Sequence, residues 1–98
     1  MFIVLLRFGD NRGAAGAHMD GHKAWLQQGF ADGVFALAGS LQPSSGGAIV
    51  AHNIARADLE LRVGEDPFVA EGVVEAEIIE ITPALTDARL AFLKGAAA

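Results

Sequence analysis

Apolar residues gather in four runs along the chain, at residues 2–8, 34–41, 48–52 and 73–81. Each run is followed within two residues by Gly, Pro or Asn. Short apolar runs that end in turn formers are typical of buried strands. We therefore predict four strands, and the loop at residues 42–47 is expected to join the second and third as an antiparallel hairpin. Glu75, Glu77 and Glu80 are expected to form a solvated stripe along the last strand.

Between these runs, apolar positions recur at the spacing of a helix. In residues 15–30, residues on one side of the predicted helix follow one another at intervals of three or four positions. They are His18, His22, Trp25, Leu26 and Phe30. This spacing predicts an amphipathic helix whose inner face carries two histidines, with Trp25 and Phe30 as core anchors.

Two further helices are expected in the second half of the chain. In residues 56–63, Leu59 and Val63 share one helical face, and Gly64 followed by Pro67 ends the helix. A short turn is expected over residues 68–71. Thr86 is expected to cap a last helix that runs through residues 90–93.

The resulting order, β-α-β-β-α-β, is that of the ferredoxin-like α+β fold, in which both helices lie on one face of a four-stranded antiparallel sheet. The strands are apolar on almost every residue, so we expect both faces of the sheet to be shielded from water. A second copy of the chain is the natural cover for the face without helices. We therefore expect a homodimer in which two sheets form an α/β barrel, with an extra C-terminal helix on each chain.

Composition narrows the classes of partner and site. A chain of 98 residues forms one domain, residues 1–98, and its small size favours burial of a further face in a dimer. A net charge of −5 with seven scattered basic residues argues against nucleic-acid binding. The lack of cysteine excludes disulfides and thiolate sites. The sequence shows no signal peptide and no membrane span, so the cytoplasm is the expected compartment.

Three blocks of sequence, at residues 22–26, 37–41 and 66–73, read HKAWL, LAGSL and DPFVAEGV. In this order and spacing, residues 1–83 resemble the YCII-related family. The Asp-Pro-aromatic block is the most specific of the three, and the helix histidine comes next. The last helix is a local addition to the family pattern.

The resemblance implies a ferredoxin-like fold, a dimer, and a pocket in which His22 lies near Asp66. Gly39 and Ser40 stand where members of the family often have Gly-Pro, and Phe68 stands where Tyr is also common. Most of the family has no assigned reaction, but members are associated with degradation of aromatic compounds, including dehydrochlorination. Ser40 is expected to line the pocket, since it lacks the Gly-x-Ser-x-Gly setting of a nucleophile.

A histidine paired with a carboxylate is chemically useful, because imidazole titrates near neutral pH and the carboxylate fixes its tautomer. His22 is thus the candidate base, and Asp66 is the residue that orients it. The alternative is structural: a partly buried helix histidine and a turn aspartate before Pro67. Arg7 ends the first strand and either holds an anionic substrate or pairs with a surface carboxylate such as Glu77.

His18 and His22 are four residues apart, a spacing at which two imidazoles can chelate a metal if Asp66 or His52 supplies a third ligand. This spacing is common by chance, and no metal site is assigned. The leading hypothesis is a cofactor-independent enzyme, a lyase or an isomerase, that acts on a small aromatic or carbonyl compound. The alternatives are a non-catalytic small-ligand or regulatory module and a metal enzyme that uses His18.

Overall fold

A computed structural model describes residues 1–95, which contain one antiparallel sheet in the order β2-β3-β1-β4. The strands are β1 (Phe2–Phe8), β2 (Phe35–Leu41), β3 (Gly46–Ala51) and β4 (Val74–Glu80). The four predicted strands are confirmed. The third begins earlier than predicted, because Gly46 and Gly47 already pair with β1.

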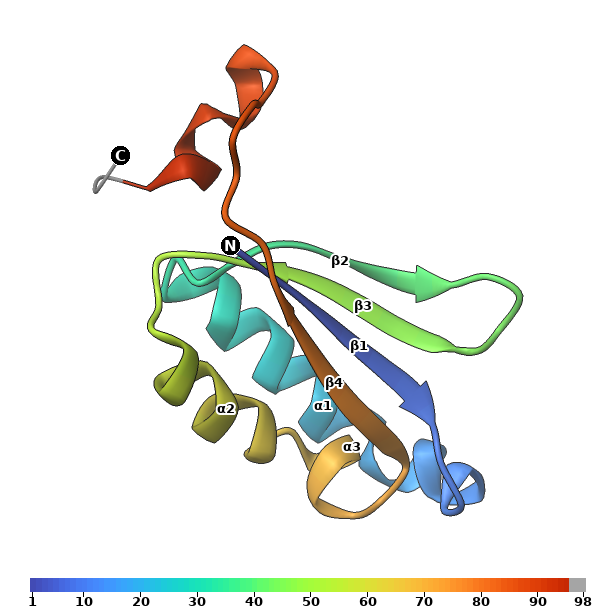
Figure 1. The fold of residues 1–98 in the computed structure, drawn as a ribbon. Coiled ribbons are helices and arrows are strands. Elements are labelled where there is room, and N and C mark those ends of the chain that lie inside the picture. The colour runs from blue at the N-terminus through green and yellow to red at the C-terminus, as the bar shows by residue number, and fades with distance from the viewer. Residues whose placement is uncertain (96–98) are drawn as a thin grey trace.

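The helices lie on one face of this sheet (Figure 1). They are α1 (Ala15–Ala31), α2 (Arg56–Gly64) and the short α3 (Pro67–Ala70), and a 3₁₀ turn, η1 (Arg12–Ala14), leads into α1. The order of elements and of strands is ferredoxin-like, so the predicted fold is confirmed. Because α1 packs against both β2 and α3, its middle lies next to the residues that follow α2.

Side chains of β1 alternate between the two faces of the sheet. Phe2, Val4 and Leu6 are buried under the helices, whereas Ile3 and Leu5 on the other face are only partly buried. Directly paired residues of neighbouring strands share a face. The helix-free face therefore also carries Leu37, Ala48, Val50 and Ile79. Near Ile3 this face is an apolar surface that the single chain leaves uncovered, whereas Arg7, Glu75 and Glu77 make its other end polar.

One predicted core anchor of α1 lies at the surface. Phe30 is 45% exposed and meets the Phe35 ring edge-on. The buried position on this turn belongs to Gly29, whose lack of a side chain lets the Phe35 ring lie against the helix backbone. Trp25, the other predicted anchor, packs against the core, with its ring edge-on to Phe35.

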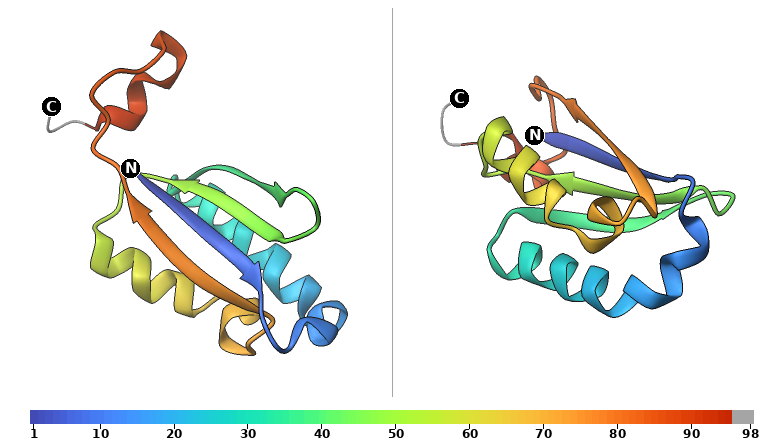
Figure 2. Two further views of the ribbon diagram at one scale, coloured as in Figure 1. Left: turned by 45° about the vertical axis from the view of Figure 1, so that its right-hand side comes forward. Right: turned by 90° about the horizontal axis from the view of Figure 1, so that it is seen from below.

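After β4 the chain leaves the sheet and ends in a segment that projects from the body of the molecule (Figure 2). The predicted last helix is the 3₁₀ helix η2 (Ala88–Lys94), and its cap is Asp87 rather than Thr86. The Asp87 carboxylate accepts the Arg89 backbone N–H at 2.8 Å. The segment has little packing to support a regular α-helix, and Leu85 is 92% exposed. Of the helices within residues 1–95, none has the length and apolar character to span a membrane.

Candidate active site

The start of α3 holds Asp66 in place. Its backbone is extended, with φ −61° and ψ 122°, as expected for a residue before proline, and Pro67 takes the first helical position, where an N–H is not needed. The Asp66 Oδ1 atom accepts the Phe68 N–H at 3.0 Å and so caps the helix. The side chain is completely buried, so the surrounding core sets its direction.

His22 comes from the middle of α1 and meets the same carboxylate oxygen. Its Nδ1 lies 2.8 Å from Asp66 Oδ1, and its side chain is 14% exposed. The imidazole also stacks on the Phe68 ring, with 4.0 Å between the centroids and an interplanar angle of 2°. Because the carboxylate accepts Nδ1–H, a neutral His22 carries its free lone pair on Nε2. Both the orientation and the tautomer of the ring are therefore fixed.

Further contacts tie α1 to α2 behind this pair. The Trp25 indole N–H donates to the Arg62 backbone carbonyl at 3.0 Å, and the Arg62 guanidinium donates to the Asp32 carboxylate at 2.9 Å. The guanidinium, helped by a hydrogen bond from Gln28, holds the pKa of Asp32 below its ordinary value. These bonds fix the spacing of α1 and α2, and hence the position of the Asp66 backbone relative to α1.

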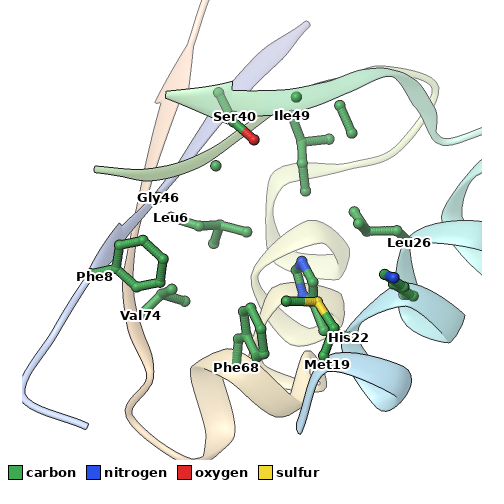
Figure 3. A pocket seen from close by; sticks show the side chains of 15 residues that line it. Leu6, Phe8, Met19, His22, Leu26, Ser40, Gly46, Ile49, Phe68 and Val74 are labelled. Carbon is green, nitrogen blue, oxygen red and sulfur yellow. The ribbon is translucent and has the colours of Figure 1, made fainter. Parts of the chain in front are cut away.

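A cavity of about 320 Å³ lies between α1, α3 and the helix-facing side of the sheet (Figure 3). The polar side chains that line it are His22, Lys23 and Ser40. Figure 3 shows the His22 imidazole pointing into the cavity and the Ser40 hydroxyl directed into it from the opposite wall. The rest of the wall is mainly apolar, formed by Leu6, Phe8, Met19, Leu26, Ile49, Phe68 and Val74 among others.

Four of the five predicted site residues meet at this cavity. His22, Gly39 and Ser40 line it, and Asp66 lies directly behind His22. The fold therefore brings together α1, β2 and the start of α3, which are far apart in the sequence. One wall of the cavity carries the oriented His22 imidazole, and the opposite wall carries the Ser40 hydroxyl.

Arg7, the fifth predicted site residue, lies on the other face of the sheet. Its neighbours Leu6 and Phe8 line the cavity on the helix side, so the alternation along β1 turns Arg7 away. The Arg7 guanidinium donates to the Glu77 carboxylate at 2.7 Å, and both side chains are 55% exposed. Of the two roles that the sequence suggested for Arg7, this surface ion pair with Glu77 is the one present in the structure.

The metal site considered from the sequence has no ligand set within residues 1–95. In that part of the chain, no three side chains of His, Asp or Glu converge, so His18 and His22 form no such cluster with Asp66. His52 lies elsewhere, with its ring edge-on to Phe92 in the C-terminal segment. His22 is instead hydrogen-bonded to Asp66 alone among the side chains of residues 1–95.

Sequence reasoning missed two features of the cavity: Lys23 on its wall and the stacking of Phe68 on His22. Lys23 comes four residues after Met19 and three before Leu26, spacings that place these three cavity residues on one side of the helix. The Phe68 ring meets a partner in a distant helix, and no spacing rule in the sequence connects the two. Only the first feature had a signal in the sequence.

No family model matches this sequence, and no curated protein is significantly similar to it. A solved structure that resembles this one is 5-chloro-2-hydroxyhydroquinone dehydrochlorinase from Burkholderia phenoliruptrix, in complex with 2,5-dihydroxybenzoquinone. The likeness covers 83% of this chain and 93% of that one, with a TM-score of 0.66 and 14% sequence identity. This chain has the fold of that dehydrochlorinase. At such low identity the likeness to the dehydrochlorinase establishes the fold, which is the one that the YCII-related resemblance implies.

Proposed function

We propose that this chain belongs to the YCII-related family and is a cofactor-independent enzyme that binds a small aromatic or carbonyl compound in the cavity. His22 acts as the base that removes a proton from this compound. Asp66 orients the imidazole and stabilises the imidazolium that forms. The reaction is a lyase reaction of the dehydrochlorinase kind or an isomerisation, since both begin with loss of a proton from an acidic hydroxyl or carbon.

The observation that carries this proposal is the hydrogen bond of 2.8 Å between His22 and Asp66 at the wall of an apolar cavity. Because the carboxylate occupies Nδ1, the Nε2 atom is the one that receives the proton. Apolar walls limit competition from water for this atom. General-base catalysis by a positioned imidazole typically contributes about 10²–10⁴-fold in rate.

The proposed reactions balance without an oxidant or reductant. In a dehydrochlorination, the ring reacts as its keto tautomer, in which the carbon that bears chlorine also bears a hydrogen. A hydroxyl proton of this tautomer goes to Nε2 of His22, and the electron pair of the broken O–H bond moves through the ring and expels chloride. In an isomerisation, the proton that Nε2 removes returns to a different atom of the substrate. Neither reaction changes the redox state of the protein.

The size of the cavity supports a substrate with a single ring. At about 320 Å³ it is close to the lower end of ligand pockets, which run from about 300 to 1,000 Å³. The dehydrochlorinase of the same fold acts on a chlorinated hydroquinone, and 2,5-dihydroxybenzoquinone is bound in its structure. We therefore take chlorinated and unchlorinated hydroquinones as the first compounds to test.

A second candidate is a non-catalytic module that binds the same class of compound. Its support is that the Asp66 carboxylate also caps α3 and that the His22 ring stacks on Phe68. In this case the pair has a structural role and shapes the cavity without moving a proton.

The same proposal includes a homodimer, formed through the helix-free face of the sheet, that works in the cytoplasm. The support for the dimer is the apolar character of that face, where Leu37 and Ile79 are 56% and 38% exposed. A second copy of the chain would cover these side chains with the same kind of surface.

The proposal is tested by measuring chloride release and isomer formation from a panel of hydroquinones with wild-type protein and His22→Ala. We expect His22→Ala to lower turnover by about 100-fold or more while the compounds still bind. The matched control is His18→Ala, because His18 lies on the same helix but does not line the cavity. Binding without turnover by wild-type protein would favour the binding module, and equal turnover by both variants would remove His22 from the mechanism.

A further inference from the structure

Lys23 is the one Lys or Arg side chain among the residues of the described chain, 1–95, that line the cavity. Lys23 lines the cavity and is also exposed, as expected for a side chain whose aliphatic stem packs on a wall while its charged end stays in water. The ion pairs within residues 1–95 do not include Lys23. The side chains that line the cavity include no Asp or Glu from this part of the chain. The nearby Asp66 carboxylate is buried behind His22 and bonded to it.

A hydroxyl stands across the cavity from α1. Ser40 belongs to β2, on the opposite wall, and Figure 3 shows its oxygen directed into the cavity. Between the hydroxyl and the helix, the wall is formed by apolar residues such as Leu26 and Ile49. A ring held by these apolar walls therefore has polar partners on both sides.

The net charge of the chain makes this single lysine important. At −5, the protein as a whole repels anions, and the potential of distant charges is screened within about 8–10 Å in physiological salt. The affinity of the cavity for an anion therefore depends on the cation on its wall. Lys23 is that cation among the lining residues.

We propose that Lys23 makes the cavity selective for anionic ring compounds, namely those with a carboxylate or an ionised acidic hydroxyl. The anionic group pairs with the Lys23 ammonium, and a second oxygen on the ring accepts a hydrogen bond from Ser40. This arrangement leaves an acidic hydrogen of the ring facing His22. The inference rests on the proposed function, because it names the substrate class of the same cavity.

The test is a calorimetric measurement of binding with two probes of the same shape, 4-hydroxybenzoate and 4-hydroxybenzamide. They differ in charge and in the two N–H donors of the amide, so the change in the ratio of their affinities between wild-type protein and the Lys23 variants reports charge selection. The variants are Lys23→Gln, which removes the charge, and Lys23→Arg, which keeps it. Lys94→Gln is the matched control, because Lys23 and Lys94 are the two lysines of the chain and their loss changes the net charge equally.

We expect wild-type protein to bind the benzoate more tightly than the benzamide. Lys23→Gln is expected to weaken benzoate binding by about 10-fold, as the loss of one charge-assisted hydrogen bond does, and to change benzamide binding by less than about 2-fold. Lys23→Arg and Lys94→Gln are expected to keep the wild-type preference.

Two other outcomes are informative in different ways. If both probes bind equally and Lys23→Gln changes neither affinity, charge selection by Lys23 is wrong while the ligand cavity stands. If neither probe binds to wild-type protein, charge selection by Lys23 is wrong, and the turnover of hydroquinones decides separately on the proposed function of the cavity.

Discussion

At the scale of single residues, the Asp66 carboxylate has both a structural role and a proposed chemical role. One oxygen of its carboxylate accepts the N–H that starts α3 and also bonds His22, at 3.0 and 2.8 Å. The other oxygen, Oδ2, is buried without a partner among residues 1–95. Burial of a polar atom without a partner has a cost in stability, which the two bonds of Oδ1 offset. Conformational stability and the orientation of the base thus depend on the same side chain.

Asp66→Ala is expected to lower the free energy of unfolding by about 2 kcal/mol. Loss of the cap costs about 1 kcal/mol, and the His22 N–H left without a partner costs at least as much. The measurement is urea unfolding followed by circular dichroism. Asp87→Ala is the matched control, because Asp87 caps η2 in the same way but in an exposed segment. Equal losses in the two variants would contradict the role given to Asp66.

At the scale of elements, the approach of α1 to the sheet depends on a glycine. A Cβ atom added at Gly29 would lie 2.1 Å from the Phe35 ring, which is itself only 3% exposed. The Trp25 and Phe30 rings both make edge-type contacts with the buried Phe35 ring, which limits its freedom to move. The distance from α1 to β2, and with it the width of the cavity, follows from this contact.

Gly29→Ala is expected to lower the free energy of unfolding by about 1–2 kcal/mol, because overpacking exceeds the gain in helix propensity. Gly16→Ala, in the first turns of the same helix, has open space around the new methyl group and is expected to raise the free energy of unfolding by about 0.5 kcal/mol. Thermal unfolding of the two variants compares them directly. A stabilised Gly29→Ala protein would show that Phe35 does not constrain the helix.

Most of the fold was predictable from the sequence, because strand and helix periods were clear and turn formers separated them. The exception in α1 was Phe30, since a periodic pattern treats glycine as neutral and cannot show that Gly29 takes the buried position. The type of the last helix was also wrong, because its form depends on tertiary contacts that local spacing does not encode.

The site was less predictable than the fold. The spacing of His18 and His22 suggested a chelate, but the structure joins His22 to a residue 44 positions away. Only the family resemblance connected these two residues in advance. Arg7 was left with two roles, because β1 is apolar on both sides and its sequence did not show which face the helices cover.

At the scale of the whole molecule, the two faces of the sheet differ in what covers them. The helices bury one face, and the other exposes aliphatic side chains from all four strands, including Ile3, Leu37, Val50 and Ile79. Contiguous apolar surface of this kind is typical of an interface. The projecting C-terminal segment adds further exposed side chains at one end of the sheet, Leu85 and Phe92 among them.

Leu37→Asp is expected to convert the proposed dimer into a monomer, because the new carboxylate would be buried between two apolar sheets. The measurement is the molar mass in solution by light scattering over a range of concentrations. Leu61→Asp is the matched control, since Leu61 is 71% exposed on α2, away from the helix-free face. A monomeric wild-type protein, or equal masses for wild type and Leu37→Asp, would refute a dimer through this face.

The indole of Trp25 lies beside the site, with its ring centroid 6.1 Å from that of His22. The chain has one tryptophan and no tyrosine, so nearly all of its ultraviolet fluorescence comes from this ring. The emission of the unlabelled protein therefore comes from a ring beside the His22–Asp66 pair, and the molecule carries its own optical signal at its site.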